Sequence, residues 1–212
     1  MKSDSVSRRG FLAKSVGGAA AFQIIRPELV RGFADEKLKA GLVGCGGRGT
    51  QAIENMLTGV PNVEIVALAD IFEDRMESSI RRTQGLRPEL SSRFKVEPDK
   101  RFVGFDAYKK LISSGVDIVM LATHPAYRPM HFEAAIEAGK HVFCEKPFGT
   151  DATGVQRFMA AAKLSVEKKL TVKSGAQRRS HPAYLAEYKR LRAIEPGYAR
   201  NNSRNGFLLK AP

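Results

Sequence analysis

The stretch that decides the fold is Leu38-Lys39-Ala40-Gly41-Leu42-Val43-Gly44-Cys45-Gly46-Gly47-Arg48-Gly49, a short apolar run leading into a glycine cluster. The cluster has the spacing GxGxxG, which is weak evidence by itself in a chain with 19 glycines. Its surroundings strengthen it, because a helix is predicted over 51–57 and a second apolar run, 63–69, ends at Asp70. This order predicts a strand, a phosphate-binding turn, a helix and a second strand.

Each part of this pattern has a physical task. Gly44 allows the tight turn, Gly46 lets backbone N–H groups approach a pyrophosphate, and Gly49 lets the helix pack close to the strand. We therefore predict a dinucleotide site at Gly44, Gly46, Gly47, Arg48 and Gly49. The alternative is an ordinary glycine turn followed by a solvated aspartate.

Asp70 is expected to accept hydrogen bonds from the adenosine ribose. A carboxylate there would repel a ribose 2′-phosphate, so the sequence favours NAD over NADP as the cofactor. Arg48 and Arg75 lie near in sequence and moderate that preference.

The rest of the middle region alternates in the same way. Further strands are predicted over 116–122 and 141–144 and from 170 onward, and a loop over 85–101. Helices are predicted over 71–83, 106–112 (capped by Asp106), 130–138, 151–168 and 182–191. Such alternation predicts an α/β fold, a doubly wound parallel sheet of the Rossmann type, with ligands at the carboxyl ends of the strands.

Two later segments follow predicted strands and are therefore candidate sites. The first, Thr123 to His131, contains His124 and His131, and periodicity does not say which of the two faces a ligand. The second is Glu145-Lys146-Pro147. A lysine between a buried strand and a proline turn is expected to be partly desolvated, so that Lys146 could hold a substrate oxygen or share a proton. The alternative is a surface lysine.

The N-terminal 34 residues read as an export signal. Arg8-Arg9-Gly10-Phe11-Leu12 is followed by a short apolar stretch, 19–25, and by Gly32-Phe33-Ala34, a small-residue cleavage site. The arginine pair resembles a twin-arginine signal, which predicts export to the periplasm by that machinery. The alternative is an amphipathic N-terminal helix.

Charge and cysteine content exclude several classes. The net charge is +13, but only +6 remains for residues 35–191 once the two ends are set aside, and no basic run with interleaved aromatics occurs there. We therefore predict no nucleic-acid partner. The two cysteines lack metal-ligand or disulfide-scaffold spacing, so no metal site is predicted, and no apolar run is long enough for a stable membrane span.

The sequence resembles the Gfo/Idh/MocA oxidoreductases from about Lys37 to Leu191. The resemblance rests on residues 40–49, on Ala69-Asp70 and above all on Ala138-Gly139-Lys140-His141-Val142-Phe143-Cys144-Glu145-Lys146-Pro147. Thr123, His131 and residues 175–179 fall at matching places. Exported members of the family often carry a twin-arginine signal.

This resemblance implies an NAD(P)-binding Rossmann domain followed by a second α/β domain that binds a sugar, a cyclitol or a related polyol for hydride transfer. It implies Lys146 as the catalytic lysine beside the nicotinamide and Glu145 as a contact of the nicotinamide ribose. Thr123 and His131 would line the cofactor cleft, with Gln177 and Arg178 near the entry to the second domain.

The sequence departs from the family after Leu191. Residues 192–212 contain no aspartate or histidine, although the family's other catalytic groups lie early in its second domain. We predict a signal over 1–34, an NAD(P)-binding domain over 35–191 and an unmatched, disordered tail over 192–212. The chain is then expected to be a truncated nucleotide-binding half with little or no activity alone. Alternatives are an NAD-dependent glycoside hydrolase of the same family, an enzyme that borrows a substrate domain, and a non-catalytic NAD-binding module.

Overall fold

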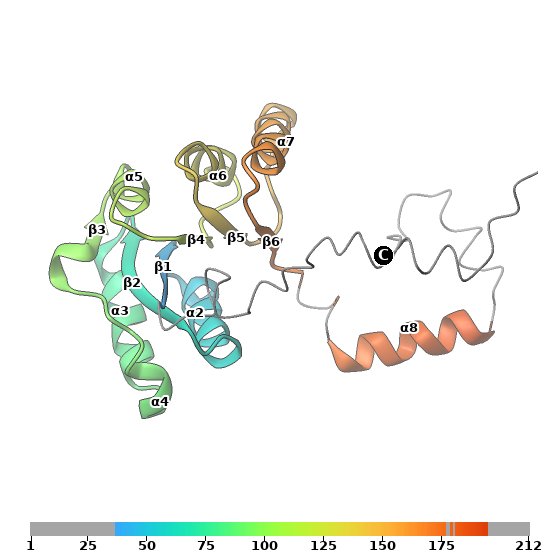
Figure 1. Cartoon of the computed structure of the whole chain (residues 1–212), viewed down its shortest axis with the longest axis horizontal. Coiled ribbons are helices and arrows are strands. Elements are labelled where there is room, and N and C mark those ends of the chain that lie inside the picture. The colour runs from blue at the N-terminus through green and yellow to red at the C-terminus, as the bar shows by residue number, and fades with distance from the viewer. Residues whose placement is uncertain (1–36, 177–178, 180, 195–212) are drawn as a thin grey trace, which may run out of the picture. The chain divides into compact units, whose positions relative to one another are not determined.

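The computed structural model describes residues 37–176, 179 and 181–194 of the chain (Figure 1). Six strands form one parallel sheet in the order β3-β2-β1-β4-β5-β6. They are β1 (Leu38–Val43), β2 (Val63–Asp70), β3 (Arg101–Val103), β4 (Ile118–Leu121), β5 (His141–Cys144) and β6 (Val172–Ser174). From β1, the strands β2 and β3 are added on one side and β4, β5 and β6 on the other, so the strand order reverses between β1 and β4. This reversal confirms the predicted doubly wound fold.

Helices cover both faces of this sheet. The helices of the described residues are α2 (Gly47–Gly59), α3 (Glu73–Gln84), α4 (Pro88–Ser91), α5 (Ala107–Ile112), α6 (Arg128–Glu137), α7 (Ala152–Glu167) and α8 (Pro182–Ile194), with a 3₁₀ turn, η2 (Pro98–Lys100). In Figure 1, α5, α6 and α7 lie on one side of the sheet and α2, α3 and α4 on the other. Each layer encloses its own cluster of buried apolar side chains. Burial on both faces explains why the central strands are almost wholly apolar.

The structure corrects the sequence prediction over 85–101. This segment is not a plain loop, because it contains α4, η2 and the start of β3. The strand escaped notice because it is a three-residue edge strand in which Arg101 and Val103 are exposed, so it has no buried apolar run. The Asp106 side chain does not cap α5, contrary to expectation; its Oδ1 lies 2.8 Å from Lys109 Nζ instead.

The predicted segments at the two ends of the chain are largely outside the described residues. The signal over 1–34 lies entirely outside them, as do residues 195–212 of the predicted tail. Residues 192–194 belong to α8, so this helix continues past the predicted domain end at Leu191. Among the described helices, none combines the length and the apolar composition that crossing a membrane requires.

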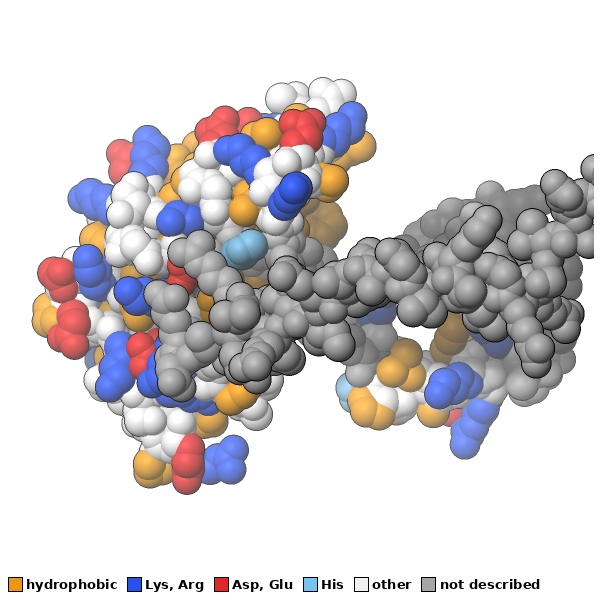
Figure 2. Space-filling view, in the orientation of Figure 1, with side chains coloured by type: hydrophobic (Ala, Val, Ile, Leu, Met, Phe, Trp, Pro, Cys, Tyr) orange, Lys and Arg blue, Asp and Glu red, His pale blue; other side chains and the backbone are white. Residues whose placement is uncertain are grey.

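Charged side chains are mixed by sign on the visible surface. On the face drawn in Figure 2, Lys and Arg side chains of the sheet domain alternate with Asp and Glu. Ion pairs such as Arg157–Glu133 and Arg82–Glu54 join neighbouring helices. Exposed pairs of this kind contribute little to stability, so apolar burial holds the domain together.

One cation has a larger structural task, at the carboxyl end of α2. The Arg93 guanidinium donates to the backbone oxygens of Leu57 and of Val60, the latter at 2.6 Å. These carbonyls close a helix whose last oxygens lack partners within the helix. We expect Arg93→Met to lower the free energy of unfolding by about 2 kcal/mol, measured by urea denaturation. The exposed Arg87→Met is the matched control, and equal effects of the two changes would contradict this role.

Candidate functional site

A cavity of about 540 Å³ opens at the carboxyl ends of β1, β2, β3 and β4. It therefore lies at the point where the strand order reverses, the place where doubly wound sheets bind ligands. Its wall combines the glycine turn, the end of β2, the β3–α5 connection and the start of α6. Predicted site residues in this wall are Gly44, Gly46, Asp70, Thr123 and His131.

The glycine turn is tight at Gly44 and closely packed at Gly49, as the sequence predicts for these two positions. Gly44 has a φ of +97°, and a Cβ there would stand 2.8 Å from the backbone of Ala122 and Thr123. A Cβ on Gly49 would stand 1.9 Å from the backbone oxygen of Gly44. Helix α2 and strand β1 thus approach each other as closely as a glycine permits.

Gly46 and Gly47 lie in open space, with no atom within 4 Å of the position a Cβ would take. No side chain caps the amino end of α2, which begins at Gly47. The first N–H groups of a helix have no partners within the helix and carry partial positive charge. Space and donors therefore coincide where a pyrophosphate would bind, and the residues present fit a dinucleotide.

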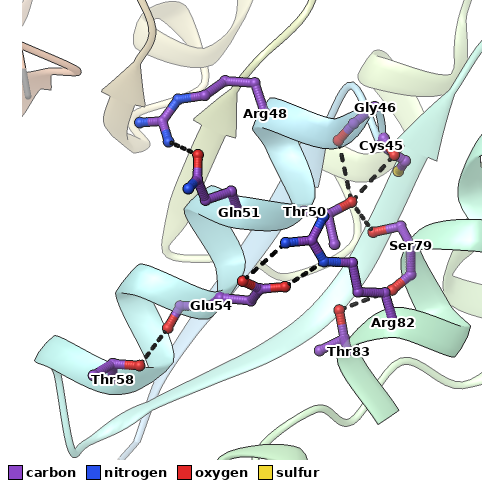
Figure 3. Close-up of polar contacts among 10 residues, drawn as sticks. All are labelled: Cys45, Gly46, Arg48, Thr50, Gln51, Glu54, Thr58, Ser79, Arg82 and Thr83. Atoms are coloured by element: carbon purple, nitrogen blue, oxygen red, sulfur yellow. Dashed lines mark hydrogen bonds and ion pairs between the residues drawn. The ribbon is translucent and has the colours of Figure 1, made fainter. Parts of the chain in front are cut away.

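Side-chain hydrogen bonds hold this turn in place (Figure 3). The Thr50 hydroxyl lies 3.1 Å from the Gly46 oxygen and 2.9 Å from Ser79 Oγ on α3. Thr50 and Ser79 are both buried. The turn is therefore fastened to the next helix as well as to its own.

Asp70, at the end of β2, links two loops around the cavity. Its carboxylate accepts the Cys45 N–H at 2.6 Å and the Phe72 N–H at 3.0 Å. A carboxylate has about four acceptor sites, so two such bonds leave capacity for ribose hydroxyls. The sequence predicted the ribose role, which stays a prediction, and missed the structural one.

His131 is the buried member of the two candidate histidines. Its Nδ1 lies 3.3 Å from the Thr123 hydroxyl, and its ring lies 4.2 Å from the Tyr108 ring, centroid to centroid. Burial, with a smaller contribution from the Arg128 charge, lowers the pKa of His131 from 6.5 to about 4. The imidazole is therefore neutral at pH 7 and can orient Thr123 by a hydrogen bond. His124, by contrast, is exposed.

Glu145 and Lys146 follow β5 but face different surroundings. Glu145 is buried and is paired with Arg48 of α2. Lys146 is exposed within the part of the chain that the structure describes, so the expectation that it is partly desolvated is wrong there. On either side of Lys146, the Glu145 carboxylate accepts a hydrogen bond from Arg48 and the Pro147 backbone oxygen accepts one from Arg128. Gln177 and Arg178 lie outside the described residues.

Several residues of the site were missed by sequence reasoning. Phe72 and Phe105 line the cavity and are largely exposed, at 61% and 71%. Phe105 follows the unpredicted strand β3, and Phe72 lay inside a predicted helix that begins only at Glu73. The rule that residues after a strand line the ligand site would have found both, had the strand and helix ends been known.

Arg128 is a third residue that sequence reasoning missed, with 3% of its surface exposed. Its guanidinium donates to the backbone oxygens of Thr123 and Pro147. It therefore ties the loop after β4 to the loop after β5.

The described residues offer neither a reactive thiol nor a metal centre. Burial raises the pKa of the Cys45 thiol and raises that of Cys144 to about 12. Both thiols therefore stay protonated at neutral pH. Within the described ranges no group of three or more His, Cys, Asp or Glu side chains could hold a metal ion.

A family model described as "Oxidoreductase family, NAD-binding Rossmann fold" matches residues 38–174. The chain belongs to the Gfo/Idh/MocA oxidoreductase family. The matched range runs from the first to the last strand of the sheet, and so contains the whole cavity wall.

Curated relatives of this chain are named as inositol 2-dehydrogenases. Inositol 2-dehydrogenase of Acidothermus cellulolyticus is 30% identical over 164 residues, which are 77% of this chain and 43% of that protein. Inositol 2-dehydrogenase 3 of Saccharopolyspora erythraea is 32% identical over 157 residues, covering 74% and 40%. The chain thus spans about two fifths of the length of these curated relatives.

Among solved structures, scyllo-inositol dehydrogenase from Lactobacillus casei has the same fold. Its cofactor-free crystal structure gives a TM-score of 0.57 at 21% identity, over 76% of this chain and 42% of that one. The crystal structure of the same enzyme with bound NAD(H) and scyllo-inositol gives 0.55 at 21%, over 74% and 41%.

Proposed function

We propose that this chain binds NAD(H) and serves as the nucleotide-binding half of an oxidoreductase that acts on a sugar, a cyclitol or a related polyol. The observation that carries the proposal is the cavity at the reversal of strand order, with an open glycine turn on one side and Asp70 on another. The substrate class is supported by the inositol dehydrogenase names of the relatives.

In this proposal, different residues bind different parts of the cofactor. The open turn at Gly46 and Gly47 and the amino end of α2 hold the pyrophosphate. Asp70 accepts ribose hydroxyls on the adenosine side, and the exposed rings of Phe72 and Phe105 cover the adenine. Bound nicotinamide supplies the hydride acceptor or donor.

The residues after β4 and β5 contact the nicotinamide end of the cofactor and the substrate. The neutral His131 keeps the Thr123 hydroxyl oriented in the cleft wall. Glu145 accepts hydroxyls of the nicotinamide ribose, and Lys146 holds or exchanges the proton of the substrate hydroxyl. Lys146 is exposed in the described residues, so other parts of a working enzyme must cover it to exclude water.

The test of this function is dinucleotide binding and its dependence on Asp70. We expect calorimetry to detect NAD binding by the wild-type chain, and Asp70→Asn to raise the Kd for NAD about tenfold, because a charge-assisted hydrogen bond is lost. The same substitution should bring the Kd for NADP closer to the Kd for NAD, since the charge that repels a 2′-phosphate is gone.

Asp74→Asn is the matched control for this experiment. It removes the same charge from an exposed carboxylate on α3, with 78% of the side chain accessible. If the ratio of the Kd for NADP to the Kd for NAD is unchanged in Asp70→Asn, or changes equally in the control, the role of Asp70 is contradicted. Absence of any binding to the wild-type chain would contradict the function itself.

A further inference from the structure

The ion pair between Arg48 and Glu145 joins the amino end of α2 to the turn after β5, although the two residues lie 97 positions apart in the sequence. Arg48 Nε donates to Glu145 Oε1 at 2.9 Å, and Nη2 of the same guanidinium reaches the same oxygen. Nη1 donates to Gln51 Oε1 at 3.0 Å (Figure 3). Only 4% of the Glu145 side chain is accessible, against 31% of that of Arg48. The carboxylate is therefore held in place while the cation lies at the surface.

The fold encloses Glu145 tightly. A Cβ on Gly175, just after β6, would stand 2.2 Å from Glu145 Oε1. Arg48 is the one side chain among the described residues that forms an ion pair with this carboxylate. A buried carboxylate without a partner is strongly unfavourable, so Glu145 needs Arg48 in this state.

Arg48 also occupies the second position of α2, next to the open Gly47. A pyrophosphate at this helix end would bring negative charge close to a long and partly accessible guanidinium. Arginine forms strong, geometrically matched hydrogen bonds to phosphate oxygens. The two anions, Glu145 and the pyrophosphate, therefore compete for one cation.

We propose that Arg48 exchanges partners when the dinucleotide binds, an inference that rests on the NAD-binding function proposed above. In the cofactor-free protein it neutralises Glu145. On binding it turns to the pyrophosphate, and Glu145 then accepts the hydroxyl groups of the nicotinamide ribose in place of the guanidinium. A ligand with a pyrophosphate but no second ribose takes Arg48 away from Glu145 without replacing it.

ADP is such a ligand and provides the test. We expect Arg48→Met to raise the Kd for ADP about tenfold in calorimetry, as the loss of a charged phosphate contact would. Glu145→Gln should lower the Kd for ADP about fivefold, because the competing charge is gone. Glu145→Gln should lower the Kd for NAD by a smaller factor, since it also weakens the contact with the nicotinamide ribose. Arg48→Lys should restore part of the ADP affinity.

The double variant separates exchange from a general change of charge. If Arg48 carries the effect, Glu145→Gln should not alter ADP affinity in the Arg48→Met background. A second ion pair, between Glu54 of α2 and Arg82 of α3, supplies matched controls (Figure 3). Arg82→Met and Glu54→Gln change the charge by the same amounts and should leave the Kd for ADP within about twofold of wild type.

Folding of the variants is checked by thermal unfolding. Arg48→Met should lower the Tm because Glu145 loses its partner, and adding Glu145→Gln should restore much of it. If Arg48→Met alone does not fold, Glu145→Gln compared with the double variant still measures the contribution of Arg48 to ADP binding.

The outcomes that overturn the exchange differ from those that overturn NAD binding. Equal effects of Glu145→Gln with and without Arg48, or an ADP affinity independent of both residues, contradict the exchange alone. Failure of the wild-type chain to bind either NAD or ADP contradicts the proposed function and the exchange with it.

Discussion

Replacing Gly49 by alanine should destabilise the domain by about 3 kcal/mol or more, because a Cβ cannot be accommodated there without moving the backbone. The added carbon would stand 1.9 Å from the Gly44 oxygen and 3.2 Å from Leu42 Cδ2. Relief requires α2 to move away from β1, which also displaces the amino end of the helix from the cavity. We expect both a lower urea midpoint and the loss of NAD binding.

Gly59→Ala is the control for this prediction. Gly59 ends the same helix, is exposed, and has no atom within 4 Å of the position of a Cβ. The substitution should leave the free energy of unfolding within about 0.5 kcal/mol of wild type or raise it slightly. If Gly49→Ala unfolds at the same urea concentration as this control, the close contact of helix and strand is not required.

The second large effect is a loss of stability in acid that originates from His131. Its pKa is about 4 in the folded protein, against 6.5 for the free side chain. Between these values the unfolded chain binds more protons than the folded one, so the free energy of unfolding falls as pH falls. The contribution is complete above pH 6.5, and about 3 kcal/mol of it should be lost by pH 4.

Urea denaturation at several pH values measures this loss. His131→Gln keeps a hydrogen-bonding group near Thr123 but does not titrate, so its stability should depend less steeply on pH across this window. His124→Gln, at an exposed position in the same cavity wall, should follow the wild-type curve. A steep dependence that persists in His131→Gln would assign the acid sensitivity to other groups.

Prediction from sequence succeeded where neighbouring residues in the chain settle the outcome. Apolar runs such as 63–69 and the alternation of helix with strand identified the parallel sheet. The GxGxxG spacing and the following acid located the turn and Asp70, because these residues act through backbone geometry within one β-α-β unit. The three-residue edge strand β3 was missed because its side chains are not buried and so have no periodic signature.

The sequence did not predict the environment of the candidate side chains. Lys146 was expected to be desolvated and is exposed, while His131 could not be distinguished from His124 by periodicity. Burial depends on what packs against a residue from elsewhere in the fold. His131 is covered by Tyr108, which is 23 positions earlier in the chain and belongs to a different helix.

The sequence by itself determined the class of fold, the family resemblance and the position of the glycine turn, because these follow from local spacing. Only the tertiary structure decided that Glu145 is buried against Arg48, that Arg128 joins two loops, and that Gly175 lies against the Glu145 carboxylate. These contacts join residues that the sheet order, not the chain order, makes neighbours. Electrostatic and packing energies depend on distance in space, which local sequence patterns do not contain.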